Sequence, residues 1–163
     1  MPSLPFKIKY VDRHSLPSCE RKGSVAQVGY QESLLIITFM QNRTVVETAT
    51  GLPVVTMPKI IYDTVPRVGI DGTVAVGTLN GEKIVLCDII SIEGNSVKVK
   101  TWEERLEILK KLCDGFTTEG AKVFIRSSVW TRGLMKVHSD LKAKNSEARL
   151  LLRIPGETAV SIC

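Results

Sequence analysis

The chain has 163 residues, 44% of them hydrophobic, and carries a formal net charge of +5. This length suits one domain with a core of its own, and no apolar run approaches the roughly 20 residues that a membrane-spanning helix needs. The first ten residues lack the apolar segment and small-residue cleavage site of a secretory signal. We therefore expect an intracellular protein, cytoplasmic or nuclear, with no membrane partner.

The first 23 residues are predicted to be an extended leader, because Pro2, Pro5 and Pro17 lie there among polar residues. The remainder, residues 24–163, is predicted to be a single domain. Stretches rich in β-branched and aromatic residues predict its first strands at residues 25–30, 34–40, 43–48 and 53–56. The breaks between these strands are short, which favours hairpins.

Three further strands are predicted at residues 73–79, 83–92 and 96–100. Asn80-Gly81 separates the first two and is a strong hairpin signal, and Gly94-Asn95 is a second one. This part of the chain should therefore form antiparallel sheet.

The clearest helix signal begins at Thr101. The sequence Thr101-Trp-Glu-Glu104 is a capping box, and apolar residues recur after it at helical spacing until Gly115. A strand at residues 122–126, a helix at 133–142 and strands at 149–154 and 158–162 complete the prediction. The expected fold class is α+β, with mostly antiparallel twisted sheets and a few packed helices.

The four cysteines lie far apart, at Cys19, Cys87, Cys113 and Cys163. No two of them form a Cys-x-x-Cys pair, and their spacing matches neither a zinc site nor a dense disulfide framework. We interpret them as reduced thiols in a reducing compartment. The sequence predicts no metal site and no cofactor.

Basic residues gather in the last third of the chain. From Thr118 to Arg153, three acidic residues accompany eight basic ones, which are Lys122, Arg126, Arg132, Lys136, Lys142, Lys144, Arg149 and Arg153. Clustered Lys and Arg favour a polyanionic partner such as DNA or RNA, because they release counterions from phosphates. An ordinary solvated surface explains these interspersed charges about as well. The only aromatic residues in this stretch are Phe124 and Trp130, so sequence-specific readout by base stacking is not predicted.

A family resemblance rests on residues 71–76, Asp-Gly-Thr-Val-Ala-Val, and 87–90, Cys-Asp-Ile-Ile, followed by Gly94 and Arg105. This order and spacing resemble the nucleotidyltransferase domain of ATP-dependent DNA ligases and mRNA capping enzymes, where Asp-Gly-Glu-Leu and Phe-Asp precede a glycine and an arginine that opens a helix. Arg43 before Thr50-Gly51, and residues 147–153, look like echoes of two other motifs of the family. The resemblance implies a ligase-like fold, with Arg43 and Arg105 as nucleotide-binding residues.

The sequence departs from the family where the chemistry is concentrated. The family attacks ATP or GTP with a lysine two residues before Asp-Gly, but here that position falls on Thr38 or Phe39. Thr73 replaces the acidic residue after Asp-Gly, and the resemblance ends at Cys163, before the family's last lysine pair and its oligonucleotide-binding domain. We therefore predict a degenerate and truncated relative with no catalytic residue.

Three functions remain open on this sequence. The first is a non-catalytic nucleic-acid- or nucleotide-binding module built on a decayed ligase-like domain. The second is a protein-interaction or structural subunit that reuses the fold, since fold does not fix function. The third is a residual nucleotidyltransferase that a partner chain completes. The two histidines, His14 and His138, are interpreted as structural residues, because neither has the partners of a catalytic triad.

Overall fold

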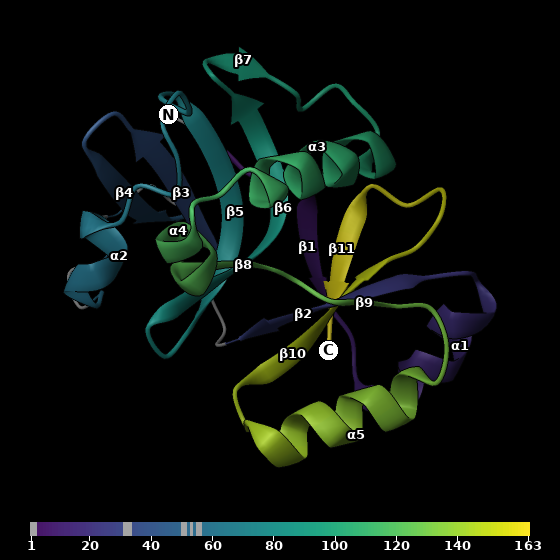
Figure 1. The fold of residues 1–163 in the computed structure, drawn as a ribbon. Coiled ribbons are helices and arrows are strands. Elements are labelled where there is room, and N and C mark those ends of the chain that lie inside the picture. Colours follow the sequence, from purple (N-terminus) through teal and green to yellow (C-terminus); the bar gives the residue numbers. More distant parts are fainter. Residues whose placement is uncertain (1–2, 31–33, 50–51, 53, 55–56) are drawn as a thin grey trace. The chain divides into compact units, whose positions relative to one another are not determined.

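The computed structural model describes residues 3–30, 34–49, 52, 54 and 57–163. The chain divides into two compact units. Unit 1 comprises Met1–Pro5 and Ser33–Arg126, and unit 2 comprises Phe6–Glu32 and Ser127–Cys163. Each unit contains one β-sheet, and the two sheets share no strand (Figure 1).

The division differs from the leader and single domain that the sequence predicts. Residues of the expected leader form strand β1 (Lys7–Tyr10), the short 3-10 helix η1 (Arg13–Ser15) and helix α1 (Leu16–Arg21), all within unit 2. Leu16 and Cys19 of α1 are buried in the core of that unit. Burial of these apolar side chains stabilises a segment that its prolines alone would leave extended.

The sheet of unit 1 has the strand order β4-β3-β5-β6-β7, and β8 pairs with β6. Its strands are β3 (Leu35–Met40), β4 (Arg43–Thr48), β5 (Thr73–Asn80), β6 (Lys83–Ile92), β7 (Asn95–Ser96) and β8 (Phe124–Arg126). Neighbours run antiparallel except β6 and β8, which are parallel. The hairpin predicted at Asn80-Gly81 is confirmed: Gly81 has a φ of 63°, a conformation that glycine adopts without strain.

Three helices accompany this sheet: α2 (Lys59–Asp63), α3 (Trp102–Asp114) and α4 (Thr118–Val123). The capping box of α3 is confirmed, since Glu104 N donates to Thr101 Oγ1 over 3.2 Å and Thr101 N donates to Glu104 Oε2 over 3.0 Å. In the described part of the chain, no helix is long and apolar enough to cross a membrane.

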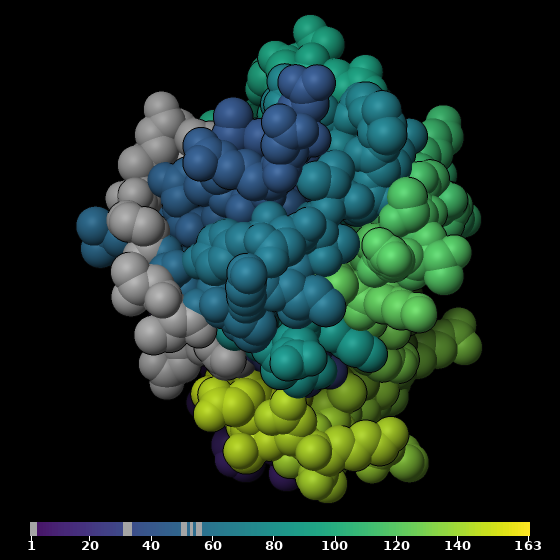
Figure 2. All heavy atoms as spheres, turned by 60° about the vertical axis from the view of Figure 1, so that its left-hand side comes forward, coloured from purple at the N-terminus to yellow at the C-terminus, as the bar shows by residue number. Residues whose placement is uncertain are grey.

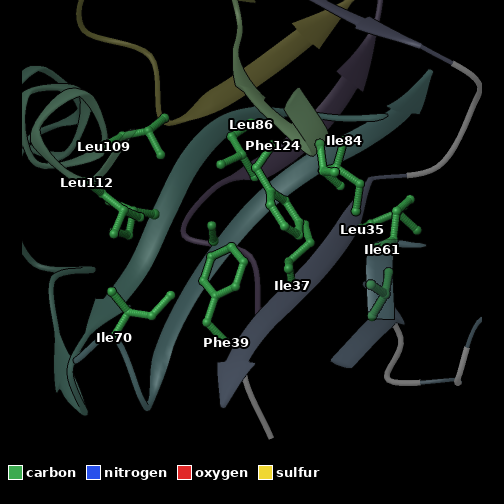
Figure 3. Packing of buried hydrophobic residues seen from close by; sticks show 14 of the residues in the cluster. Leu35, Ile37, Phe39, Ile61, Ile70, Ile84, Leu86, Leu109, Leu112 and Phe124 are labelled. Carbon is green, nitrogen blue, oxygen red and sulfur yellow. The ribbon is translucent and has the colours of Figure 1, made fainter. Parts of the chain in front are cut away.

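The core of unit 1 contains three phenylalanines packed edge to face. The ring centroid of Phe39 lies 5.1 Å from that of Phe124 and 6.4 Å from that of Phe116. Leu109 and Leu112 of α3 point into the same cluster (Figure 3). Edge-to-face pairs of this kind contribute about 0.5–1.5 kcal/mol beyond burial alone.

Unit 2 has the strand order β1-β11-β10-β2-β9. Its remaining elements are β2 (Val25–Tyr30), β9 (Val129–Trp130), helix α5 (Leu134–Lys144), β10 (Ala148–Arg153) and β11 (Ala159–Ile162). The pairing of β1 with β11 is parallel, and the other pairs are antiparallel. Helices α1 and α5 pack together beside β10, where Leu16 and Leu134 meet Ala26, Leu150 and Leu152 in one buried cluster (Figure 1).

Several local predictions are wrong. Strand β2 does not form a hairpin with β3 but pairs with β9 and β10 of the other sheet. The strand predicted at residues 96–100 is reduced to β7, because Val97 N donates back to Ile90 O and a turn then leads into α3. The strand predicted at residues 122–126 is α4 as far as Val123, and only then β8. The strand predicted at residues 53–56 lies mostly outside the described residues.

Candidate functional site

The net positive charge of the chain lies in unit 2. This unit contains eleven Lys and Arg against six Asp and Glu, whereas unit 1 contains eleven of each. The whole excess of +5 therefore lies in unit 2. Its N-terminal segment adds Lys7, Lys9, Arg13, Arg21 and Lys22, which the sequence analysis did not place with the basic residues near the C-terminus.

Six of the eight basic residues predicted to bind nucleic acid lie in unit 2, and Lys122 and Arg126 lie in unit 1. Arg132 and Lys144 are exposed. Lys136 forms an exposed pair with Asp140, with 2.7 Å between Nζ and Oδ2, and the hydrogen bond that Lys136 donates to Asp140 raises the pKa of Lys136. The structure thus divides the predicted cluster and adds cations from the other end of the chain.

Lys142 and Arg149 meet where α5 turns into β10. Lys142 Nζ donates to the carbonyl oxygen of Ser146 over 3.0 Å, and Arg149 Nη1 donates to the same oxygen over 3.3 Å. Burial lowers the pKa of Lys142, and the positive charge of Arg149 lowers it further. Two cations therefore share one neutral oxygen, which positions both side chains without cancelling their charge.

Arg13 and His138 extend this group. Arg13 Nη2 donates to Ser139 Oγ over 2.5 Å, which brings η1 against α5. Burial lowers the pKa of His138, and the charges of Lys142, Arg13 and Arg149 lower it as well, while a hydrogen bond to the backbone of Cys163 acts in the opposite direction. We call Arg13, His138, Lys142 and Arg149 the basic cluster.

The sequence alone does not reveal the basic cluster. Arg13 was assigned to the leader, and His138 was interpreted as a structural residue. One signal was present in the sequence: His138 and Lys142 are four residues apart on a predicted helix and so share one face. The approach of Arg13 depends on a contact across 126 residues, which no local pattern encodes.

Arg153, the last of the predicted nucleic-acid-binding residues, is only 8% exposed. Its Nε donates to Gln27 Oε1 over 3.3 Å, and its guanidinium carbon lies 4.9 Å from the centroid of the Phe6 ring, a cation–π geometry. The sequence analysis did not single out Gln27 or Phe6. These contacts stabilise unit 2 and distinguish Arg153 from the exposed cations.

Arg105, predicted to bind nucleotide, forms a buried bidentate pair with Asp88 in unit 1. Arg105 Nε donates to Asp88 Oδ1 over 2.9 Å and Nη2 donates to Oδ2 over 3.2 Å, and both side chains are at most 7% exposed. Arg105 Nη1 donates to the carbonyl of Lys100 over 2.8 Å. This geometry attaches the first turn of α3 to β6, so it gives Arg105 a structural task; its nucleotide contact stays a prediction.

Arg43, the other predicted nucleotide-binding residue, is exposed at the start of β4. It lines a hollow of about 410 Å³ together with Tyr62 and Asp63. A second hollow of about 570 Å³ lies between the β3–β4 turn and the segment after α2, and its lining includes Arg67 and Asp71. Figure 2 shows the face of unit 1 on which the β3–β4 turn and the segment after α2 lie side by side.

The residues of the Asp-Gly motif, Asp71 and Gly72, make hydrogen bonds within unit 1 that support its fold. Asp71 Oδ1 accepts a hydrogen bond from Gln41 N over 2.9 Å, and Gly72 has a φ of 83°. A Cβ at Gly72 would lie only 3.1 Å from the backbone nitrogen of Gly94, which donates to the carbonyl of Gly72 over 3.2 Å. The hydroxyl of Thr73 accepts from Glu93 N over 3.0 Å. The two glycines of the family resemblance therefore meet across the hairpin.

The positions where the resemblance places the nucleophile lie on β3. Thr38 is half-buried, and Phe39 is fully buried in the core of unit 1. All four cysteines are free, and burial raises the pKa of Cys113 to about 12, so that its thiol stays protonated. Among the described residues, no group of three or more His, Cys, Asp and Glu side chains is arranged to hold a metal ion.

Comparison with known proteins shows the fold. No protein-family model and no curated protein matches the sequence. A solved structure titled mycobacterial DNA ligase D complexed with ATP and MES is similar to this chain, with a TM-score of 0.60 and 10% sequence identity over 85% of this chain and 54% of that one. The chain thus spans about half the length of that ligase D chain. Its α+β fold with antiparallel sheets is consistent with a ligase nucleotidyltransferase domain, as the sequence predicted.

Proposed function

We propose that this protein is a nucleic-acid-binding module on a ligase-like fold, and that unit 2 supplies the binding surface. The confinement of the whole net charge of +5 to unit 2 carries this proposal. A polyanion gains most of its affinity from Lys and Arg that displace its condensed counterions. A compact unit with eleven cations and six carboxylates offers that gain, whereas a neutral unit does not.

The way the cations are held supports the same function. Arg13, Lys142 and Arg149 donate to a serine hydroxyl or to backbone carbonyls rather than to carboxylates. Their hydrogen bonds position them, but their charge remains available. Phosphate oxygens form shorter and stronger bonds with such cations than neutral oxygens do.

We propose that binding is independent of base sequence. The two aromatic residues of the basic stretch are poorly placed for stacking, since Phe124 is buried in the core of unit 1 and Trp130 is half-buried. Stacking on exposed aromatic rings contributes about 1–3 kcal/mol per base where it occurs. Tyr10 on β1 of unit 2 is 70% exposed, and a base stacked on it would add affinity without sequence preference, because every base has a π-face.

We further propose that the module binds without nucleotidyl transfer. The resemblance places the nucleophile at Thr38 or Phe39, and neither side chain contains an amine. Incubation with labelled ATP and GTP, each followed by denaturing separation, tests this part of the proposal. A protein-bound, acid-labile label would overturn it, because a phosphoramidate is acid-labile.

Fluorescence anisotropy with single-stranded DNA, RNA and duplex DNA tests the binding itself. We expect the logarithm of the association constant to fall linearly with the logarithm of salt concentration, with a slope of roughly −0.7 per contacted phosphate for single strands. The double variant Lys142→Gln/Lys144→Gln should reduce the steepness of this slope by about one per lost contact. Its matched control, Lys110→Gln/Lys111→Gln, removes two exposed charges from α3 of unit 1 and should leave the slope unchanged.

Two outcomes would overturn the proposal. One is the absence of binding to all three nucleic acids at low ionic strength. The other is an equal loss of salt dependence in both double variants, which would show that the charges of unit 1 contribute as much as those of unit 2.

A further inference from the structure

The basic cluster brings together residues from three separate parts of unit 2. Arg13 comes from η1, His138 and Lys142 come from adjacent turns of α5, and Arg149 comes from the beginning of β10. The hydrogen bond from Arg13 to Ser139 places η1 against the middle of α5, and the shared carbonyl of Ser146 places Lys142 beside Arg149. The fold thus gathers three permanent cations around one imidazole.

The imidazole of His138 has one nitrogen to spare. Its Nδ1 is buried and has no hydrogen-bond partner among the described residues. A hydrogen bond to the backbone of Cys163 favours the protonated imidazole and raises the pKa of His138, against the larger lowering by burial. A buried nitrogen without a partner costs stability, and protonation of this ring would leave a buried N–H donor without an acceptor.

The acidic groups near the cluster do not neutralise it. Glu147 acts on Lys142, and Asp12 acts on Cys163, whose thiol has a pKa raised chiefly by burial. Neither carboxylate lies within ion-pair distance of Arg13, Lys142 or Arg149 among the residues that the structure describes. Three cations face two carboxylates, and protonation of His138 would add a fourth positive charge.

We propose that the basic cluster is a binding site for one phosphate group, with Arg13, Lys142 and Arg149 as its cationic ligands beside the imidazole of His138. The site deepens the nucleic-acid function proposed above and rests on it for the source of the phosphate. Either a backbone phosphodiester or a terminal phosphomonoester has the required chemistry. Arginine suits both, because its planar guanidinium can donate two parallel hydrogen bonds to one phosphate.

Occupancy of the site must change the protonation of His138. Burial and the three cations disfavour the charged form of His138, and a phosphate group would reverse the local sign of the field. By thermodynamic linkage, a phosphate that raises the pKa of His138 binds more tightly to the protonated form by the same factor. The imidazole therefore reports binding directly.

Nuclear magnetic resonance of the imidazole tests the proposal on the full chain. The probe is inorganic phosphate, and the variant His14→Gln assigns the signals, since the chain has only two histidines. We expect saturating phosphate to raise the pKa of His138 by about one unit, which corresponds to tenfold tighter binding to the protonated form. The pKa of His14 should change less.

Variants separate this site from general attraction to the surface. Arg149→Gln and Lys142→Gln should each abolish most of the phosphate-dependent rise in the pKa of His138, while Arg149→Lys, which keeps the charge, should retain part of it. Lys110→Gln on α3 of unit 1 is the control and should behave like the parent chain. Dispersed amide spectra establish that each variant is folded. An unchanged pKa of His138 in phosphate, or equal rises in parent, Arg149→Gln and Lys110→Gln, would overturn the proposal.

Two oligonucleotides distinguish the sources of the phosphate. Equal rises in the pKa of His138 with 5′-phosphorylated and 5′-hydroxyl strands would assign the site to backbone phosphates, and a larger rise with the phosphorylated strand would assign it to a terminal phosphate. Nucleic-acid binding without any response of His138 would overturn the phosphate site and leave the proposed function intact. A response of His138 to inorganic phosphate without nucleic-acid binding would overturn the proposed function and leave the phosphate site intact.

Discussion

Unit 1 and unit 2 contain equal numbers of basic residues but use them differently. In unit 1 the counts of basic and acidic residues are equal, and Arg105 and Asp88 form a buried bidentate pair that attaches α3 to β6. In unit 2 the cations outnumber the carboxylates, and Arg13, Lys142 and Arg149 rest on neutral oxygens. The Arg105–Asp88 pair of unit 1 therefore stabilises the fold, whereas no carboxylate of the described residues pairs with Arg13, Lys142 or Arg149 in unit 2.

The largest expected effect is a loss of stability in unit 1, where a buried ion pair supports the fold. Arg105→Met removes the cation that pairs with the buried carboxylate of Asp88, and the loss of one member of such a pair costs about 3–5 kcal/mol. Its counterpart in unit 2, Arg149→Met, removes a half-buried cation from neutral acceptors and should cost less than about 1 kcal/mol. Urea unfolding measures both free energies.

The two tryptophans make the readout specific, because Trp102 lies in unit 1 and Trp130 in unit 2. In a Trp130→Phe background, fluorescence follows unit 1 alone; in a Trp102→Phe background it follows unit 2. Equal losses of stability from Arg105→Met and Arg149→Met would contradict the distinction between structural and available charge.

A smaller loss is expected from Gly120→Ala in α4. A Cβ at this position would lie 2.5 Å from Cα and 2.8 Å from the carbonyl oxygen of Pro66, and backbone atoms cannot move aside cheaply. Overpacking of this kind costs about 1–3 kcal/mol. Ala121→Ser, at the exposed neighbouring position, should change the free energy of unfolding by less than about 0.5 kcal/mol. Similar values for the two variants would show that α4 does not need this close approach.

A smaller effect is expected on the salt dependence of nucleic-acid binding, and it tests whether unit 2 or the basic stretch of the sequence supplies the binding surface. Lys7→Gln/Lys9→Gln removes two exposed cations of β1 in unit 2, and Lys122→Gln/Arg126→Gln removes two exposed cations of unit 1. We expect the first pair to flatten the salt dependence of nucleic-acid binding by about one unit of slope per lost contact, and the second pair to leave it unchanged. The reverse order would favour the basic stretch of the sequence over unit 2 as the binding surface.

The smallest expected effect concerns pH. The pKa of His138 in the folded protein is lowered from 6.5, chiefly by burial, so the unfolded chain binds a proton more readily. The free energy of unfolding should therefore decrease as the pH falls from 7 through the range below 6.5. His138→Gln should reduce this decrease, as urea unfolding at a series of pH values would show. An equal or steeper decrease in the variant would mean that another group causes the pH dependence.

Local signals in the sequence predicted much of the secondary structure. The capping box at Thr101 and the turn at Asn80-Gly81 each depend on residues a few positions apart, and both are confirmed. The pairing of β2 with β10 joins residues more than 110 positions apart, and the pairing of β1 with β11 about 150. No local pattern encodes such pairings, which is why two units were predicted as a leader and one domain.

The candidate site was predictable only in part, for the same reason. Lys142, Lys144 and Arg149 follow one another in the sequence and were identified from their charge. Arg13 joins them only because β1 and η1 belong to unit 2, and the spare nitrogen of His138 becomes visible only when its surroundings are known. Arg105 shows the converse, since its place in a family-like motif suggested a nucleotide contact while its geometry is that of a buried structural pair.

The most direct test of the comparison is a map of amide chemical-shift changes during titration of the isotope-labelled chain with single-stranded DNA. We predict changes concentrated in Phe6–Glu32 and Ser127–Cys163, largest near Arg13, Lys142 and Arg149, and diminishing as salt is added. Changes concentrated instead in unit 1, or spread equally over both units, would contradict the assignment of the available charge to unit 2.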